Sequence, residues 1–203
     1  PDAEAARLAP AAPCRLSTCA ACGFSFNSRF DPGLVIYDER YNNDVVSDAF
    51  AAYYRDLAAR LIARFDLTSG VVYDIGCGAG TFLKELCRQA PGIAGVGVDP
   101  ACEPVREGNF RLIRDVFSPE LFGREARLVL LRHVLEHIDQ PTAFAAALGA
   151  AMPRGAPLFV EVPDLGWIYR ERAFWDFCYE HCNYFTAASL KSVLEAAGLA
   201  VGD

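Results

Sequence analysis

The sequence lacks the features that would place the protein in a membrane or on a nucleic acid. No apolar run approaches the roughly 20 residues of a membrane-spanning helix, and the first residues lack the apolar core of a signal peptide. Basic residues are in the minority, with 19 Lys and Arg against 26 Asp and Glu and a net charge of −7. Because nucleic-acid backbones require a basic face, we expect no nucleic-acid partner. We expect a cytoplasmic protein without a membrane partner.

The eight cysteines lack the paired spacing of a disulfide framework, so we expect reduced thiols. Cys19 and Cys22 form a C-x-x-C pattern, which can present two thiolates to one zinc ion. A structural zinc site needs four ligands, and Cys14 is the one further cysteine nearby. A redox role fits poorly, because the pair does not lie between a strand and a helix. Zinc binding by these cysteines and a metal-free turn both stay open.

The composition and the hydrophobic pattern predict the fold class. With 203 residues, of which 53% are hydrophobic and 22% charged, the chain can form one sizeable core and a small appendage. The predicted strands are 71–75, 95–98, 110–113, 127–131 and 158–162. The predicted helices are 47–65, 81–89, 101–106, 118–123, 141–151 and 187–197. This alternation predicts an α/β fold, a Rossmann-like doubly wound parallel sheet with helices on both faces.

We divide the chain into three parts. Residues 1–36 form a small cysteine-containing segment, near whose end the apolar run 34–37 predicts a short strand. Residues 37–66 form a loop and a helix that act as a lid or linker. Residues 67–203 form the sheet domain, which ends in a helix with Thr186 as its N-cap and Gly198 as its terminator.

A glycine turn follows the first predicted strand of the sheet domain. Gly76, Gly78 and Gly80 alternate with small residues directly after Asp74, and a helix pattern begins at Thr81. Such a turn allows backbone to approach a ligand closely, because glycine has no Cβ. Dinucleotide sites usually have a third glycine where this chain has Thr81, and they place an anionic pyrophosphate at the turn. The carboxylate of Asp74 instead favours a cofactor that carries an ammonium or sulfonium group.

Two further acidic residues follow the next predicted strands. Asp99 lies 25 positions after Asp74, close to the spacing of an acid that binds ribose hydroxyls. A helix N-cap is the alternative role, since Pro100 comes next. Asp115 follows the third strand and could accept the amino group of an adenine, or it could be an ordinary surface aspartate.

These residues together resemble class I S-adenosylmethionine-dependent methyltransferases. The resemblance rests on 74–80, Asp99, Asp115 and 131–138, and it covers about residues 37–200. It implies S-adenosylmethionine as the cofactor and a final antiparallel hairpin, which we do not find in this sequence. In such enzymes the first acid and the turn hold the methionine part, the second acid binds the ribose, and the segment after the third strand meets the adenine. The cofactor-binding residues expected on this basis are Tyr41, Asp74, Gly76, Cys77, Gly78, Asp99, Asp115, Val116, Arg132 and His133.

Two of the expected cofactor residues have alternatives. An N-terminal tyrosine closes over the cofactor in the resembling group, and Tyr37 or Tyr41 can take this role or simply pack. His133 and His137 would share a face if the segment were helical, and with Glu136 they suggest a metal site. The zinc-protease pattern H-E-x-x-H is absent, so we expect His133 to line the cofactor pocket instead.

The segment 161–186 is unusually rich in aromatic residues for a connection between a strand and a helix. It lies where substrate loops belong, although aromatic residues that fill the edge of the core are the alternative. Its part 179–186 resembles methyltransferases with an N-terminal zinc-binding segment, among them sugar C-methyltransferases that act on nucleotide-linked keto sugars. This resemblance implies that the intact protein could bind zinc through its N-terminal cysteines.

The resemblance implies two catalytic residues. His181 would be the general base that removes a proton from the carbon next to a carbonyl, and Glu180 would support it. The sugar enzymes have a tyrosine three positions before this histidine, where this chain has Cys178 and places a tyrosine at 179.

The expected function is therefore methyl transfer from S-adenosylmethionine to a small-molecule acceptor, with C-methylation of a nucleotide-linked keto sugar as the specific case. O- or N-methylation of a small metabolite is the alternative, followed by a non-catalytic module that binds the cofactor. A nicotinamide dehydrogenase fits worst, because Asp74 and Thr81 suit a phosphate site poorly. No feature of the sequence indicates an oligomeric state.

Overall fold

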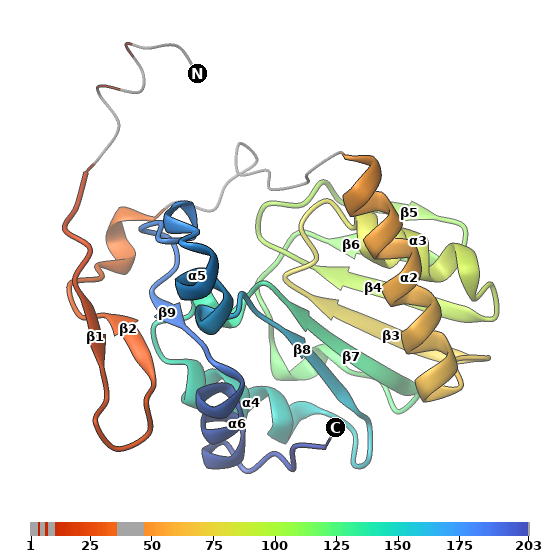
Figure 1. Cartoon of the computed structure of the whole chain (residues 1–203). Coiled ribbons are helices and arrows are strands. Elements are labelled where there is room, and N and C mark those ends of the chain that lie inside the picture. Colours follow the sequence, from red (N-terminus) through yellow and green to blue (C-terminus); the bar gives the residue numbers. More distant parts are fainter. Residues whose placement is uncertain (1–3, 5–6, 8–10, 36–46, 203) are drawn as a thin grey trace.

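A six-stranded sheet forms the centre of the molecule (Figure 1). The computed structural model describes residues 4, 7, 11–35 and 47–202. The strands run in the order β5-β6-β4-β3-β7-β8, and all neighbours are parallel except β5 and β6. Their bounds are Gly70–Ile75 for β3, Ile93–Val98 for β4, Val105–Glu107 for β5, Phe110–Ile113 for β6, Ala126–Arg132 for β7 and Leu158–Glu161 for β8. The parallel strands place their carboxyl ends at one edge of the sheet.

The sheet is buried on both faces, which explains why its strands are continuous apolar runs rather than alternating ones. In β3, Val72 faces one apolar cluster while Tyr73 and Ile75 face the other. The same division holds in β7, where Leu128 and Leu130 alternate with their neighbours. All five predicted strands are confirmed to within two residues at each end, since burial on both faces leaves a strong signal in the sequence.

Helices cover the two faces in pairs. The helices α2 (Asp48–Phe65) and α3 (Thr81–Gln89) pack on one side, and α4 (Pro141–Ala151) and α6 (Ala187–Ala196) on the other. Local chemistry sets their ends: the Ser47 hydroxyl accepts from the Phe50 N–H, and Thr186 forms a capping box with Ser189. Gly198 follows α6 with a φ of +81°, as a helix terminator requires.

A second, three-stranded sheet joins the N-terminal segment to the aromatic-rich segment 161–186. It consists of β1 (Leu16–Thr18), β2 (Ser25–Asn27) and β9 (Asn183–Tyr184), and all its pairs are antiparallel. The partner of β2 therefore begins two residues after His181. The hairpin lies beside β9 in Figure 1, so the N-terminal segment supports the 176–184 region directly.

Three predictions about local structure are wrong. The region 101–106 is not a helix, because Pro104 interrupts it and β5 then adds to the edge of the sheet against β6. Within 118–123, only Pro119–Leu121 is helical, as one turn of 3-10 helix. The apolar run at 34–37 is not a strand at its start, since Pro32–Leu34 form another 3-10 turn with Asp31 as the cap, and residues 36 and 37 lie outside the described part.

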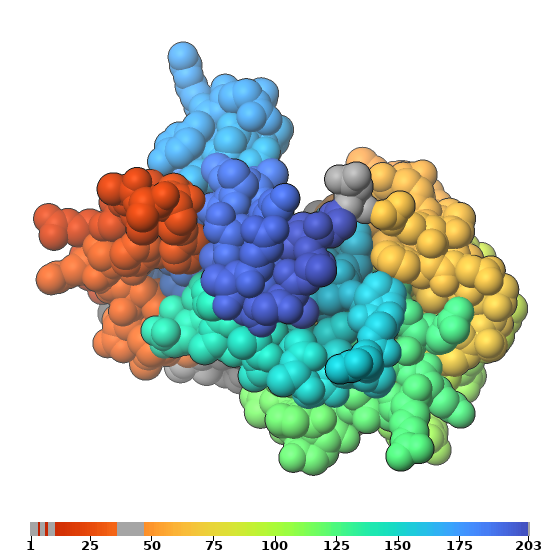
Figure 2. Space-filling model, turned by 90° about the horizontal axis from the view of Figure 1, so that it is seen from below, coloured from red at the N-terminus to blue at the C-terminus, as the bar shows by residue number. Residues whose placement is uncertain are grey.

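One segment stands out from the body of the molecule. Figure 2 shows that the light-blue part of the chain, which contains α5 (Leu165–Glu171) and the 3-10 turn Phe174–Asp176, projects beyond α6 and the N-terminal hairpin. In the part of the chain that the structure describes, no helix has both the length and the apolar character to cross a membrane.

Candidate functional site

The glycine turn has the backbone that the sequence predicts. Gly76, Gly78 and Gly80 all have positive φ values, of 72°, 54° and 76°. A side chain at Gly76 would strike Val134, and one at Gly80 would strike Leu112. A Cβ at Gly78 would meet no atom within 4 Å, because this glycine borders open space. Gly76 and Gly80 therefore serve packing within the protein, whereas Gly78 leaves room for a ligand.

Replacing Gly78 with alanine is expected to weaken cofactor binding by about 10-fold or more, since an added methyl group and a strained turn disturb the surface that the ligand approaches. The left-handed backbone itself costs about 1–2 kcal/mol of stability with a non-glycine residue. Gly108→Ala is the matched control, because Gly108 has a φ of 55° and likewise no neighbour within 4 Å of a built Cβ. Calorimetric titration with S-adenosylhomocysteine and thermal unfolding separate the two effects; equal loss of affinity in both variants would contradict the assignment.

Asp99 lies against the glycine turn. Its Oδ2 accepts a 2.9 Å hydrogen bond from the Gly78 N–H, and its Oδ1 accepts one of 2.7 Å from the Ala101 N–H. The carboxylate thus caps the turn that follows it and also holds the glycine turn in place. Asp115 lies on the loop after the neighbouring strand β6, exposed, with Oδ1 accepting from the Val116 N–H at 2.8 Å. Both acids lie at the carboxyl edge of the sheet, where an open α/β sheet binds its ligand.

Asp74 is buried within β3, with 3% of its surface exposed. Burial raises the pKa of Asp74 to about 7, and the Arg132 guanidinium opposes that rise. Arg132, at the end of β7, lies over the rings of Phe82 and Tyr54, at 4.0 and 4.9 Å from their centroids. The arginine thus places one positive charge beneath the glycine turn, beside a carboxyl group that the interior makes easy to protonate.

Glu161 is a site residue that the sequence analysis did not select. It ends β8 and accepts hydrogen bonds from the Tyr53 hydroxyl of α2 and, at 2.7 Å, from Arg132 Nε. Its Oε1 also lies 3.7 Å from His133 Nε2. Burial alone would raise the pKa of Glu161, but His133 and Arg132 outweigh it and lower that pKa to about 2. The sequence did contain a signal for Glu161: it is a carboxylate near the carboxyl end of the last predicted strand, 158–162.

His133 does not share a helical face with His137. It has a left-handed φ of 54° and precedes the 3-10 turn Leu135–His137. Its Nδ1 lies 3.4 Å from Oε1 of Glu136, which is 1% exposed. Burial would lower the pKa of His133, but the carboxylates of Glu136 and Glu161 outweigh it and raise the pKa to about 9. His133 is therefore a cation at neutral pH and bridges two acids at the edge of the sheet.

His181 lies beside His137, with ring centroids 4.9 Å apart and planes at 71°. His181 Nδ1 is 3.2 Å from the Asp176 carbonyl oxygen, and His137 Nδ1 is 3.0 Å from the Glu180 carbonyl oxygen. Since a carbonyl oxygen only accepts, both Nδ1 atoms donate in these contacts, and in the neutral form of either ring the lone pair is therefore on Nε2. The backbone carbonyl of Glu180 thus contacts His137, and the support of His181 by the Glu180 carboxylate stays a prediction.

Large aromatic side chains near His181 are exposed rather than packed. Phe174 is 76% and Trp175 63% exposed, and Trp167 and Tyr169 are 44% and 58% exposed. These four side chains do not fill the edge of the core. Of the remaining aromatics, Tyr184 is buried beneath Phe177.

Of the N-terminal candidates, Cys19 and Cys22 lie in the tight turn between β1 and β2, and Cys14 is exposed just before β1. Backbone N–H groups of Cys22 and Ala21 lower the pKa of Cys19. Among the residues that the structure describes, these cysteines do not form a three-ligand group, so zinc binding there stays a prediction. Tyr37 and Tyr41 lie outside the described residues.

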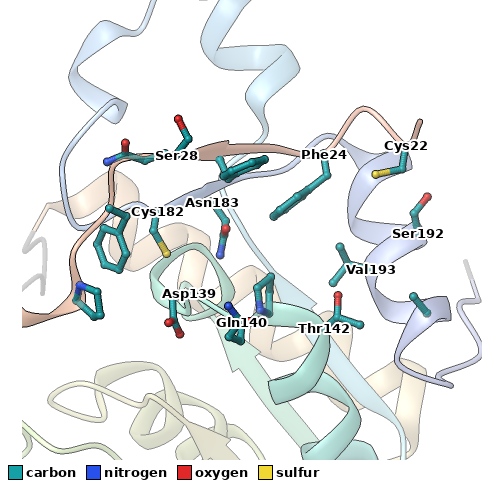
Figure 3. A pocket seen from close by; sticks show the side chains of 16 residues that line it. Cys22, Phe24, Ser28, Asp139, Gln140, Thr142, Cys182, Asn183, Ser192 and Val193 are labelled. Atoms are coloured by element: carbon teal, nitrogen blue, oxygen red, sulfur yellow. The ribbon is translucent and has the colours of Figure 1, made fainter. Parts of the chain in front are cut away.

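A cavity of about 630 Å³ lies away from the glycine turn (Figure 3). Phe24 and Ser28 of the hairpin side, Cys182 and Asn183, and Val193 of α6 are among the residues that line it. The cavity is thus adjacent to the segment that carries His181. Asp99 and Asp115, at the carboxyl edge of the large sheet, do not line it.

Comparison with known proteins agrees with this geometry. A family model described as a methyltransferase domain matches residues 49–202. The C-methyltransferase NovU of Streptomyces niveus is 33% identical over 186 residues, which are 85% of this chain and 43% of NovU. The chain thus spans less than half the length of this curated relative.

Solved structures show the same fold. The methyltransferase CalO1 of calicheamicin biosynthesis, in its S-adenosylhomocysteine-bound form, matches with a TM-score of 0.51 and 22% identity over 74% of this chain and 52% of CalO1. A SAM-dependent methyltransferase from Archaeoglobus fulgidus matches with a TM-score of 0.52 and 25% identity, over 71% of this chain and 68% of that protein.

Proposed function

The chain belongs to the methyltransferase-domain family, and from this membership we propose that it transfers a methyl group from S-adenosylmethionine to a small-molecule acceptor. The observation that carries the proposal is the carboxyl edge of the sheet, where Gly78 borders open space and the Asp99 carboxylate lies 2.9 Å from its N–H. When bound, S-adenosylmethionine supplies an electrophilic methyl group on a sulfonium. The open backbone at Gly78 and the carboxylate of Asp99 fit such a ligand.

The residues of the edge have distinct tasks in this proposal. The turn at Gly76 and Gly78 lets the ligand approach the backbone closely, and Asp99 offers its carboxylate to the ribose hydroxyls. Asp115 and Val116 lie one strand further along, where the adenine would be placed. Arg132 pairs with Glu161, and His133 lies between the carboxylates of Glu161 and Glu136, beside the expected methionine end.

We propose that the acceptor binds on the side of His181 and that His181 is the general base. The neutral ring carries its lone pair on Nε2, and the ring is partly exposed within a loop flanked by exposed aromatic side chains. For a nucleotide-linked keto sugar, the base takes the proton from the carbon next to the carbonyl, and the enolate carbon then attacks the methyl group. The similarity to the C-methyltransferase NovU supports this acceptor class.

O- or N-methylation is the second candidate. The same lone pair can take a proton from a hydroxyl or can orient an amine, and exposed aromatic side chains such as Phe174 and Trp175 do not select a carbon nucleophile by themselves. Mass spectrometry of the product distinguishes a C–CH₃ from an O–CH₃ or N–CH₃ group, because only the first survives hydrolysis and dealkylation.

Isothermal titration tests the cofactor half of the proposal. The 203-residue chain is expected to bind S-adenosylhomocysteine and S-adenosylmethionine with one site each, and the Asp99→Ala variant is expected to bind both more weakly. Glu103→Ala is the control, since Glu103 is an exposed acid on the loop after Asp99 whose ion pair is with Arg114. Absence of binding by the folded wild-type chain would overturn the proposal.

A further inference from the structure

We propose that Glu136, His137 and His181 form a binding site for a divalent transition-metal ion of the Zn²⁺ class. One ligand atom from each of the three side chains lies within 4.8 Å of the other two. One carboxylate and two imidazoles are a ligand set that Zn²⁺ and similar ions prefer. This set shares no residue with the cysteine turn at Cys19 and Cys22.

The buried carboxylate of Glu136 points to a ligand. Glu136 is 1% exposed, and neither of its oxygens accepts a hydrogen bond from any residue that the structure describes. His133 Nδ1, at 3.4 Å from Oε1, gives it an ion-pair contact on one side only. A buried carboxyl oxygen without a hydrogen bond is costly, and coordination to a bound cation would remove that cost.

The two imidazoles are oriented as metal ligands usually are. Histidines that bind metals generally donate their second ring N–H to a backbone carbonyl or a carboxylate, which fixes the tautomer. Both rings do so here: Nδ1 of His137 faces the Glu180 carbonyl, and Nδ1 of His181 faces the Asp176 carbonyl.

The backbone around the site holds its two halves together. Asn183 Nδ2 donates to the Leu135 carbonyl at 3.0 Å, which ties β9 to the 3-10 turn that contains Glu136 and His137. A tetrahedral ion with bonds of about 2.0–2.2 Å needs ligand atoms about 3.3 Å apart. Separations of up to 4.8 Å therefore have to shorten by up to about 1.5 Å. His181 can move inward, since it lies on a loop.

The consequence for catalysis, although not the binding itself, rests on the proposed function. A cation at this site uses the same lone pair of His181 with which the residue would take the acceptor's proton. The cation-bound protein therefore lacks its base, so the ion acts as an inhibitor that competes with proton removal.

Cobalt binding tests the site without any knowledge of the acceptor. The metal-free 203-residue chain is titrated with Co²⁺, whose visible bands report tetrahedral binding and whose near-ultraviolet charge-transfer band reports thiolate ligation. We expect one Co²⁺ to bind without the thiolate band in the Cys19→Ser/Cys22→Ser double variant. The Glu136→Gln and His181→Ala variants, in the same background, are expected to weaken this binding by about 100-fold or more.

Several results would overturn the proposal. Loss of all tetrahedral Co²⁺ binding in the cysteine double variant would assign the metal to the N-terminal turn alone. Unchanged affinity in His181→Ala, an exchange at a partly exposed residue that folding tolerates, would exclude the three-residue site even where Glu136→Gln fails to fold. Titration of the same samples with S-adenosylhomocysteine reports on the proposed function separately, because that ligand binds at the glycine turn.

Discussion

Replacing Arg132 with methionine is expected to lower the free energy of unfolding by about 3–5 kcal/mol, the usual cost of removing one partner from a buried ion pair. The Arg132 side chain is 6% exposed and Nε donates to Glu161 at 2.7 Å. Its guanidinium also faces the buried Asp74 carboxyl and lies over the ring of Phe82. Methionine keeps the apolar contact with the ring, but among the described residues it leaves Glu161 with His133 and Tyr53 as the polar contacts that offset its burial.

Chemical denaturation of the wild-type protein and of Arg132→Met measures this loss of unfolding free energy directly. Arg60→Met is the matched control, because Arg60 pairs with Asp56 at 3.0 Å on the exposed face of α2, where both side chains are more than 60% exposed. Such a pair on a helix surface contributes about 0.3–0.5 kcal/mol. If the two substitutions cost the same, the buried ion pair of Arg132 with Glu161 would contribute no more to stability than a surface pair.

The sheet could be predicted from the sequence because its physical signal is local. A parallel strand that is buried on both faces needs a continuous run of apolar residues, and Val72 and Leu130 belong to such runs. The positive φ values at Gly76 and Gly78 were predictable for the same reason, since a tight turn between a strand and a helix leaves few other conformations. The apolar strand runs and the glycine turn together predict the position of the expected cofactor site, at the carboxyl edge of the sheet.

The acceptor side could not be predicted in the same way, because its contacts join residues far apart in the sequence. Phe26 pairs with Asn183 across the small sheet, and Tyr53 of α2 reaches Glu161 at the end of β8. No periodicity in the sequence reports either contact. The resemblance selected His181, and the sequence suggested a metal site only for His133, Glu136 and His137. The grouping of Glu136 and His137 with His181 became visible only when the fold brought the two loops together.

Replacing His181 with alanine is expected to slow proton removal from the acceptor by about 10²–10⁴-fold, the range that a positioned general base contributes. Proton removal can be measured without methyl transfer when S-adenosylhomocysteine takes the place of S-adenosylmethionine. With a nucleotide-linked keto sugar in D₂O, the wild-type protein should then exchange the hydrogen on the carbon next to the carbonyl for deuterium. The affinity for S-adenosylhomocysteine should stay unchanged, because the described contacts of the His181 ring are with Asp176, His137 and Tyr184 and not with the glycine turn.

The control has to separate loss of the base from disturbance of its loop. Tyr179 lies two residues before His181, and its hydroxyl accepts a 2.9 Å hydrogen bond from the Asp31 N–H, so Tyr179→Phe loosens the same loop without touching the imidazole. The same hydroxyl donates a 3.4 Å hydrogen bond to the Arg29 carbonyl. We expect this variant to keep deuterium exchange within about fivefold of wild type, since loss of these two exposed hydrogen bonds costs about 1 kcal/mol. Exchange that persists in His181→Ala, or that disappears equally in Tyr179→Phe, would remove His181 from the role of base. If the wild-type protein shows no exchange yet methylates a hydroxyl or amine acceptor, the carbon chemistry is wrong while the methyltransferase assignment stands.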